Sequence, residues 1–189
     1  MAHGKLIIIS GPSGVGKKTI LDQIIQDKSL NLHMSISMTT RLPRNSEQDG
    51  KDYFFTSVNN FKDLITKNNF LEYAVYNNNY YGTPKSFVCE QLAAGNNVLL
   101  EIETIGVKKL STSDLPMTKI FIAPPSLETL KERLIKRNTE SIDVINQRLA
   151  KAKEELKLTN MYDYTVVNDE LTNCIEQIRK LIKQIISND

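Results

Sequence analysis

A glycine-rich segment directly behind an apolar run constrains the fold of this chain more than any other feature. Leu6-Ile-Ile-Ile9 is apolar at every position, a pattern typical of a strand buried on both faces of a parallel sheet. Gly11-Pro-Ser-Gly-Val-Gly16-Lys17 follows at once, and apolar residues then recur at helical spacing at Ile20, Leu21, Ile24 and Ile25. A strand, this loop and a helix in that order are the context that a phosphate-binding P-loop requires.

The loop predicts a nucleotide site. Its glycines let the backbone curl so that successive N–H groups point at phosphate oxygens, and the helix N-terminus adds its positive end. Lys17 would reach the β- and γ-phosphate oxygens. The residues of this segment that we expect to bind ATP are Gly11, Pro12, Ser13, Gly14, Val15, Gly16, Lys17, Lys18 and Thr19.

One position departs from the usual P-loop pattern. Lys18 stands where a Ser or Thr normally contacts Mg²⁺ through its hydroxyl. Thr19 supplies a hydroxyl one residue later, but neighbouring helical positions diverge by about 100°. Two interpretations are open: Lys18 points to solvent and water completes the Mg²⁺ shell, or the substitution damages catalysis. We favour the first and expect an active, Mg²⁺-dependent protein.

Strands and helices alternate along much of the chain. Thr83-Pro84 is expected to cap and begin a helix that runs to Ala94 and stops at Gly95, and Ser126 is expected to cap another helix. A C-terminal helix is predicted from the apolar stripe Leu171, Cys174, Ile175, Ile178, Leu181, Ile182 and Ile185. A further buried strand is predicted at 98–102, and additional strands are predicted at 119–123 and 164–167. This order predicts an α/β fold, with a P-loop NTPase-type parallel sheet flanked by helices.

Two stretches interrupt the alternation. Residues 33 to 82 alternate polar and apolar side chains, which indicates a small, half-exposed insertion of mixed α/β structure that is mainly antiparallel. Residues 127 to 150 are helical but rich in charge, as a mobile lid would be. The core domain then comprises 1–32, 83–126 and 151–189.

Composition narrows the classes of function. The 189 residues suit one domain, and Lys+Arg 24 against Asp+Glu 22 leaves a net charge of +2, so neither nucleic acid nor an anionic membrane is expected as a partner. Cys89 and Cys174 have neither disulfide-framework nor zinc spacing, and we expect two buried thiols. The N-terminal apolar run is too short for a signal peptide or membrane span, which favours a soluble, cytoplasmic protein.

A second candidate phosphate site lies in the predicted insertion. Arg41 and Arg44 are separated by a turn proline, and two guanidinium groups can clamp one phosphate because their forks match its oxygens. A solvated loop can also carry two arginines, so the pair indicates a phosphate site only because the chain also contains a P-loop.

The motifs together resemble guanylate kinases, and the resemblance runs essentially end to end. The matching segments are Gly-Pro-Ser-Gly-Val-Gly-Lys, Ser-x-Thr-Thr-Arg-x-x-Arg, Asp-Tyr-Phe-Phe, Phe-Leu-Glu72, Asn79-Tyr-Tyr-Gly-Thr83, Leu-Glu-Ile-Glu103, Ala-Pro-Pro-Ser126 and Val-Val-Asn-Asp169. The resemblance implies that the insertion binds GMP. It also implies transfer of the ATP γ-phosphoryl group to GMP or dGMP, with Mg²⁺ accompanying ATP.

The resemblance also implies which residues hold the acceptor nucleotide. Phosphate would be held by Arg41, Arg44, Tyr53 and Tyr81, and the full GMP-binding set is Ser37, Arg41, Arg44, Glu47, Tyr53, Glu72, Tyr81, Thr83, Glu101 and Glu103. Guanine presents N1–H and a 2-amino group as adjacent donors that one carboxylate can accept together, whereas adenine offers no such pair. We therefore expect Glu72 to determine specificity, with Glu101 or Glu103 as a second acidic contact.

Catalysis would depend on charge neutralisation rather than on a covalent nucleophile. The expected catalytic residues are Lys17, Arg41, Arg137 and Arg148, and Arg133 is expected to bind ATP. No certain direct protein ligand for Mg²⁺ is predicted, although Thr19 or Glu101 can hold it through water. Lys136-Arg137-Asn138 replaces the Gly-Arg-Gly of the family in the lid. The sequence does not decide whether the loss of both glycines stiffens the hinge of the lid.

Two other functions compete with the kinase. One is a non-catalytic guanylate-kinase-like binding module, against which the intact Gly16-Lys17 argues. The other is a regulatory GTPase, which would need an Asn-Lys-x-Asp signature that Val167-Asn168-Asp169-Glu170 does not supply. Monomer and homodimer both remain open from the sequence.

Overall fold

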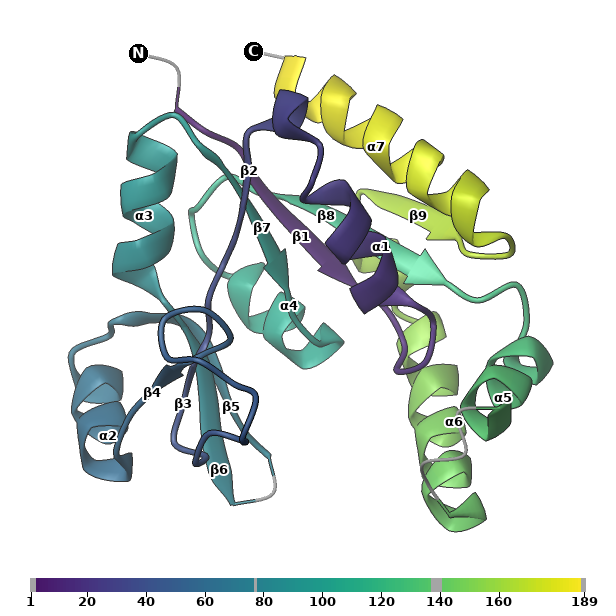
Figure 1. Cartoon of the computed structure of the whole chain (residues 1–189), viewed down its shortest axis with the longest axis horizontal. Helices are drawn as coiled ribbons and strands as arrows, with labels where there is room; N and C mark the ends of the chain where they lie inside the picture. Colours follow the sequence, from purple (N-terminus) through teal and green to yellow (C-terminus); the bar gives the residue numbers. More distant parts are fainter. Residues whose placement is uncertain (1–2, 77, 137–140, 188–189) are drawn as a thin grey trace.

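A five-stranded parallel sheet forms the centre of the computed structural model, which describes residues 3–76, 78–136 and 141–187. The strand order is β2-β7-β1-β8-β9 (Figure 1). The bounds are β1 Leu6–Ser10, β2 Leu32–Met34, β7 Asn97–Glu101, β8 Thr118–Ala123 and β9 Tyr164–Val167. The predicted fold class is confirmed, and each predicted strand is found within a residue or two of its expected bounds, although β9 is mostly exposed.

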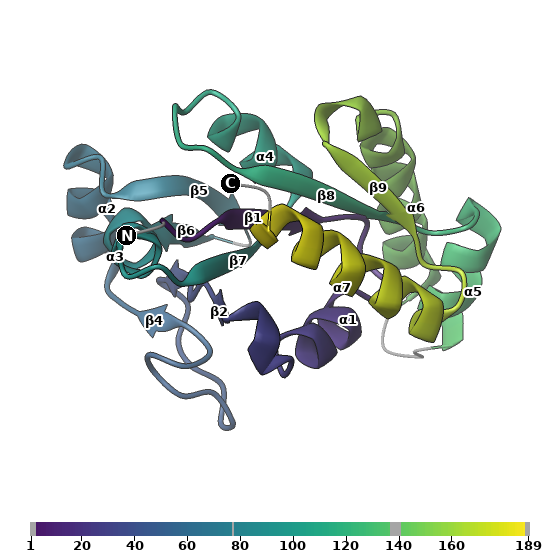
Figure 2. The same ribbon diagram turned by 90° about the horizontal axis from the view of Figure 1, so that it is seen from above.

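Strand β1 is the middle strand of the large sheet, and every one of its residues is buried. Ile7 and Ile9 face helices α1, Lys17–Ile24, and α7, Leu171–Ser187, while Leu6 and Ile8 face α3, Lys85–Ala93, and α4, Thr104–Leu110. This split follows from the two-residue period of a strand. Figure 2 shows α4 across the sheet from α1 and α7. The apolar run therefore fixes the P-loop between two packed layers.

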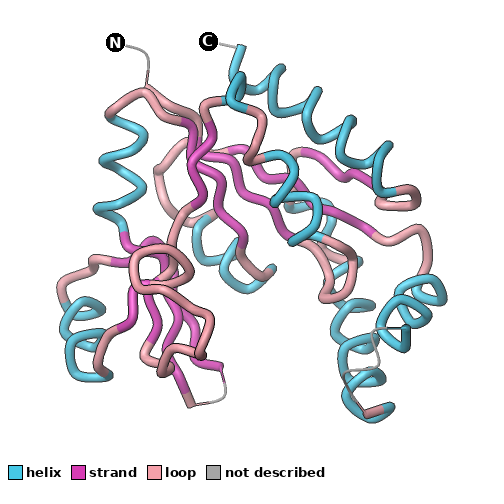
Figure 3. Tube along the Cα trace, in the orientation of Figure 1, coloured by secondary structure: helices cyan, strands magenta, loops and turns pink. Residues whose placement is uncertain are grey.

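A separate four-stranded sheet, in the order β4-β3-β6-β5, carries helix α2, Val58–Thr66. Its strands are β3 Met38–Thr39, β4 Phe54–Phe55, β5 Phe70–Tyr76 and β6 Asn79–Pro84. Pairing is antiparallel except between β3 and β4, which are parallel. The long loop between β3 and β4 stands out in Figure 3. His33 and Met34, placed in the insertion by their polarity, instead pair with β7 in the large sheet.

Helices α5, Leu127–Lys136, and α6, Ile142–Leu156, pack together around Leu130, Leu134, Ile145 and Ala152. They project from the same end of the large sheet as the small sheet does (Figure 1). Helix α6 continues beyond residue 150, and Leu156 near its end packs against the core under α3 and α4. The lid segment is thus anchored to the core through an unbroken helix. Single 3₁₀ turns occur at Lys28–Leu30 and Thr159–Met161.

Two local expectations need correction. Thr83 was expected to cap α3, but it lies in β6 opposite Glu72, and Pro84 occupies the N-cap. Cys174 is buried as expected, whereas Cys89 is exposed because it lies on the outer face of α3. The Ser126 cap is confirmed, since its Oγ accepts the Thr129 N–H at 3.0 Å. Within the described residues, every helix is too short or too polar to cross a membrane.

Candidate active site

The P-loop connects the carboxyl end of β1 to the first turn of α1. Gly14 and Gly16 have φ values of 93° and 100°, a left-handed conformation that residues with a Cβ rarely adopt. A Cβ on Gly16 would also lie 2.8 Å from Asn168 Nδ2, a buried amide that donates to the Val15 carbonyl at 2.7 Å. The loop shape therefore depends on glycine and on a side chain 153 positions further along the chain.

Lys17 is folded back over this loop. Its Nζ donates to the carbonyl oxygens of Gly11 at 2.6 Å and Pro12 at 3.1 Å. Burial lowers the pKa of Lys17, an effect opposed first by the negative charge of Glu101 and then by that of Glu155. The lysine sits where the backbone cradle for phosphate begins.

A cavity of about 390 Å³ adjoins Lys17 and brings together several predicted residues. It is lined by Gly11, Ser13, Lys17, Tyr53, Glu101, Ile102, Glu103, Arg148, Lys151 and Glu155. Arg148 Nη1 donates to Ser13 Oγ, which links the lid helix to the P-loop. Donor-side and acceptor-side candidates thus face one space.

Lys151 and Glu155 were not predicted for this cavity. Their signal in the sequence is their spacing from Arg148, at three and seven residues, which places all three on one face of α6. The side chain of Glu155 is largely desolvated, and this burial raises its pKa. Lys151 pairs with Glu103 at 2.8 Å.

A second cavity of about 380 Å³ lies on the other side of the P-loop. Its lining is Gly14, Val15, Gly16, Thr19, Arg133, Lys136, Asn168, Asp169 and Leu171. Arg133 donates to the carbonyl oxygens of Asn168 at 2.9 Å and Asp169 at 3.0 Å, so it ties α5 to the loop after β9. Arg133 therefore lines this cavity and not the one that holds Lys17. Arg137, the remaining lid candidate, lies outside the described residues.

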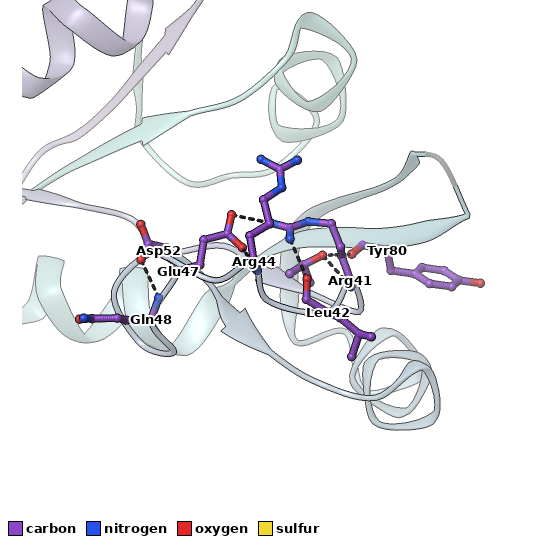
Figure 4. A network of polar contacts seen from close by, with 8 residues as sticks. Arg41, Leu42, Arg44, Glu47, Gln48, Asp52 and Tyr80 are labelled. Atoms are coloured by element: carbon purple, nitrogen blue, oxygen red, sulfur yellow. Dashed lines mark hydrogen bonds and ion pairs between the residues drawn. The ribbon is translucent and has the colours of Figure 1, made fainter.

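The predicted phosphate clamp lies in the loop after β3. Arg41 Nη2 pairs with Glu47 Oε1 at 2.8 Å, and Glu47 Oε2 accepts the Arg44 backbone N–H at 2.8 Å. The hydrogen bond from Arg41 holds the pKa of Glu47 below its ordinary value. Figure 4 shows the Arg44 guanidinium extending away from Glu47 while that of Arg41 lies against it. Arg44 is exposed.

Two tyrosines frame the clamp. The Arg41 guanidinium lies 5.5 Å from the centre of the Tyr53 ring, and the Tyr53 and Tyr81 rings meet edge to face at 6.1 Å. Burial raises the pKa of Tyr53, so its hydroxyl keeps its proton and can donate to a phosphate oxygen. The structure brings Arg41, Glu47, Tyr53 and Tyr81 together as predicted.

The candidate guanine contacts lie beside this clamp. Thr83 Oγ1 donates to Glu72 Oε1 at 2.8 Å across the β5 and β6 pair. Burial raises the pKa of Glu72, although the Thr83 hydrogen bond and the charge of Lys109 oppose the shift. Ser37 lines a third cavity of about 500 Å³ together with Tyr53 and Glu101.

The residues near Lys17 suit a magnesium ion that ATP would bring. Glu101 and Glu103 supply hard carboxylate oxygens to the cavity of Lys17, whereas Thr19 faces the opposite cavity. Lys18 is exposed and lines the Ser37 cavity with Glu101, so it faces the acceptor side. Among the described residues, no three acidic, histidine or cysteine side chains converge as a metal cage. The arrangement fits an ion held mainly by phosphate and water.

Comparison with known proteins decides the family. The family model described as guanylate kinase matches residues 3–185. This chain belongs to the guanylate kinase family. The guanylate kinase of Malacoplasma penetrans is 49% identical over 183 residues, covering 95% of this chain and 92% of that protein. That of Listeria monocytogenes serotype 4b is 46% identical over 181 residues, covering 96% and 88%.

A solved structure agrees. The crystal structure of guanylate kinase from Anaplasma phagocytophilum matches with a TM-score of 0.74 and 28% identity, covering 100% of this chain and 89% of that one. The chain is thus a nucleoside monophosphate kinase with the P-loop fold, and the binding-module alternative is not favoured.

Proposed function

We propose that this guanylate kinase binds ATP on the P-loop and GMP or dGMP on the small sheet, and transfers phosphoryl between them above Lys17. One observation carries the assignment of sites. Lys17 and Arg148 share a cavity with Tyr53 and Glu101, which belong to the predicted acceptor set. Phosphoryl transfer requires two phosphates in line with little covalent assistance, so a space between the two sites into which Lys17 and Arg148 project their charges is what the reaction needs.

On the donor side, the backbone N–H groups after Gly11 and the start of α1 would hold the triphosphate. Lys17 would leave the carbonyls it now contacts and neutralise the charge that develops on the transferring group. Arg148 reaches Ser13 from the lid and is placed to add a second cation. The cavity beside Arg133 and Asn168 would take the remainder of the nucleotide.

On the acceptor side, Arg41 and Arg44 would bind the phosphate of GMP, with Tyr53 and Tyr81 as hydroxyl donors. The Arg41 guanidinium already donates hydrogen bonds to the Glu47 carboxylate and to the Leu42 carbonyl oxygen. These two hydrogen bonds hold the guanidinium in a fixed orientation. Glu72, oriented by Thr83, would accept both donors on the guanine edge. A fixed clamp and a fixed carboxylate position the acceptor oxygen without reorganisation.

Magnesium would be held by the ATP phosphates and, through water, by Glu101, which leaves Glu103 for the acceptor nucleotide. When bound, it supplies positive charge that neutralises the phosphate oxygens. Both acidic residues lie at the carboxyl end of β7, the end at which open α/β sheets bind ligands.

We also propose that the small sheet and the pair α5 and α6 close over the two nucleotides. Each unit has its own small core and projects from the large sheet on the side of the P-loop. Closure would exclude water and limit ATP hydrolysis. Hydrogen exchange in these segments should slow when both nucleotides are present, and unchanged exchange would contradict the closure. The catalytic role of Arg137 remains a prediction from the family resemblance.

The decisive experiment is a coupled assay of ADP release with ATP and one acceptor at a time. GMP and dGMP should support turnover, while AMP, CMP and UMP should support far less. Omission of Mg²⁺ should abolish the signal. A preference for AMP, or the same ADP release with no acceptor, would refute the assignment.

A further inference from the structure

Three residues of the lid helix face the donor cavity, and the family resemblance assigns a role to only one of them. Arg148, Lys151 and Glu155 follow one face of α6, and all three line the cavity of Lys17. Lys153 lies two residues from Lys151, is exposed, and does not line this cavity. The helix therefore presents a second cation to the same space as Arg148.

Lys151 is paired across the active site. Its Nζ lies 2.8 Å from Glu103 Oε2, and Glu103 is the N-cap residue of α4 at the carboxyl end of β7. Glu103 belongs to the acceptor set implied by the family. The ion pair therefore joins the lid that covers the donor to a carboxylate intended for the acceptor.

The ion pair between Lys151 and Glu103 is of a kind that a bound phosphate can displace. Both side chains are substantially exposed, at 48% for Lys151 and 70% for Glu103, and exposed ion pairs contribute little to stability. A triphosphate on the P-loop would place several negative charges in the cavity that Lys151 already lines. When one carboxylate and a triphosphate lie in the same cavity, the Lys151 ammonium has the stronger Coulombic attraction to the triphosphate, which carries the larger negative charge. Glu103 would then lose its partner.

We propose that Lys151 is a further phosphate-binding residue of the donor site, and that ATP displaces its ion pair with Glu103. The freed Glu103 carboxylate then becomes available to the acceptor nucleotide. This inference rests on the proposed function, since it needs ATP and GMP in the two sites. It predicts that each nucleotide binds more tightly in the presence of the other, because linkage between two sites is reciprocal.

Calorimetry tests the exchange directly, with GMP titrated into the protein with and without the ATP analogue AMPPNP and Mg²⁺. In the unaltered protein, AMPPNP should tighten GMP binding several-fold. In Lys151→Met, Glu103 is free from the start, so AMPPNP should tighten GMP binding much less than it does in the unaltered protein. The matched variant Lys153→Met should behave like the unaltered protein.

Kinetics add a second measurement. Lys151→Met should lower kcat roughly tenfold, the loss expected for one charge-assisted hydrogen bond to phosphate. Lys151→Arg should restore most of that loss, because it keeps the charge. Glu103→Gln should bind AMPPNP at least as tightly as the unaltered protein, since Lys151 is no longer held away from the phosphates.

The outcomes separate this inference from the proposed function. If the unaltered protein fails to phosphorylate GMP, the proposed function is wrong. If it is active but Lys151→Met matches Lys153→Met in both kcat and the effect of AMPPNP, only the role of Lys151 is refuted. Circular dichroism melting curves of each variant identify any that does not fold, and if Lys151→Met is one of them, Lys151→Gln, which also removes the charge, takes its place.

Discussion

Replacing Glu72 by glutamine tests the guanine site with little change in shape. Glu72 Oε1 accepts the Thr83 hydroxyl at 2.8 Å, and its other oxygen lies against Gly106, where an added Cβ would come within 3.1 Å. The carboxylate plane is thus held by its neighbours. Glutamine can occupy the same volume, and Thr83 can either donate or accept.

The expected effect follows from counting hydrogen bonds to guanine. The carboxylate accepts N1–H and the 2-amino group, whereas glutamine offers one acceptor and turns an NH₂ toward the second donor. Losing one charge-assisted hydrogen bond and leaving one donor unsatisfied costs about 3 kcal/mol. Since 1.36 kcal/mol is tenfold, kcat/KM for GMP should fall by roughly two orders of magnitude.

Stability should change in the opposite direction to activity. Because burial raises the pKa of Glu72, the folded state binds its proton more readily than the unfolded state does. Its contribution to stability is present in full below the ordinary pKa of 4.5 and is lost as pH rises through the folded-state pKa. Glutamine does not ionise, so at pH 7 the free energy of unfolding of Glu72→Gln should equal or exceed that of the unaltered protein.

The assay is the coupled measurement of ADP release with GMP and ATP varied separately, together with urea unfolding at pH 4 and pH 7. Glu90→Gln, on the exposed side of α3, is the matched control and should change neither quantity. Activity of Glu72→Gln within threefold of the unaltered protein would refute the assignment. An equal rise in KM for ATP would also refute it, because the variant would then act on the whole site.

Three further predictions concern other parts of the molecule. Asn168→Ala removes the buried amide hydrogen bond to the P-loop, so it should lower the free energy of unfolding by about 1–3 kcal/mol and raise KM for ATP. The control variant Asn173→Ala should change neither quantity. Equal urea midpoints for the two variants would contradict this prediction. Lys18→Ser should shift the Mg²⁺ concentration for half-maximal rate more than KM for GMP, and rescue of an inactive unaltered protein would instead show that Lys18 disables catalysis. Burial raises the pKa of Cys174 to about 11, so a thiol reagent at pH 7 should titrate Cys89 alone until the protein is unfolded.

Local features of the chain were predictable because neighbouring residues create them. An apolar run without polar alternation can only be a buried strand or helix, and its length and the following glycines favoured the strand that became β1. The glycines predicted a backbone that curls around phosphate, and Gly14 and Gly16 have the left-handed conformation that this requires. The predicted pair of Arg41 and Arg44 is also local, since the two residues are three apart, although their hydrogen bonds to Glu47 appeared only in the structure. The specific roles of the acceptor residues came from the family resemblance, because two arginines in a loop do not by themselves identify a ligand.

The tertiary structure decided what lies opposite each local feature. Helical spacing showed that Lys18 and Thr19 diverge, but only the packing of α1 on the large sheet beside α7 placed Lys18 with Glu101 and Thr19 with Asn168. The same holds for Lys151 and Glu103, which are 48 residues apart. Their contact depends on how α6 crosses the carboxyl end of β7. Such contacts arise because apolar faces that are distant in the sequence are buried against one sheet. The charge pattern of either segment alone therefore does not predict which residue it will contact.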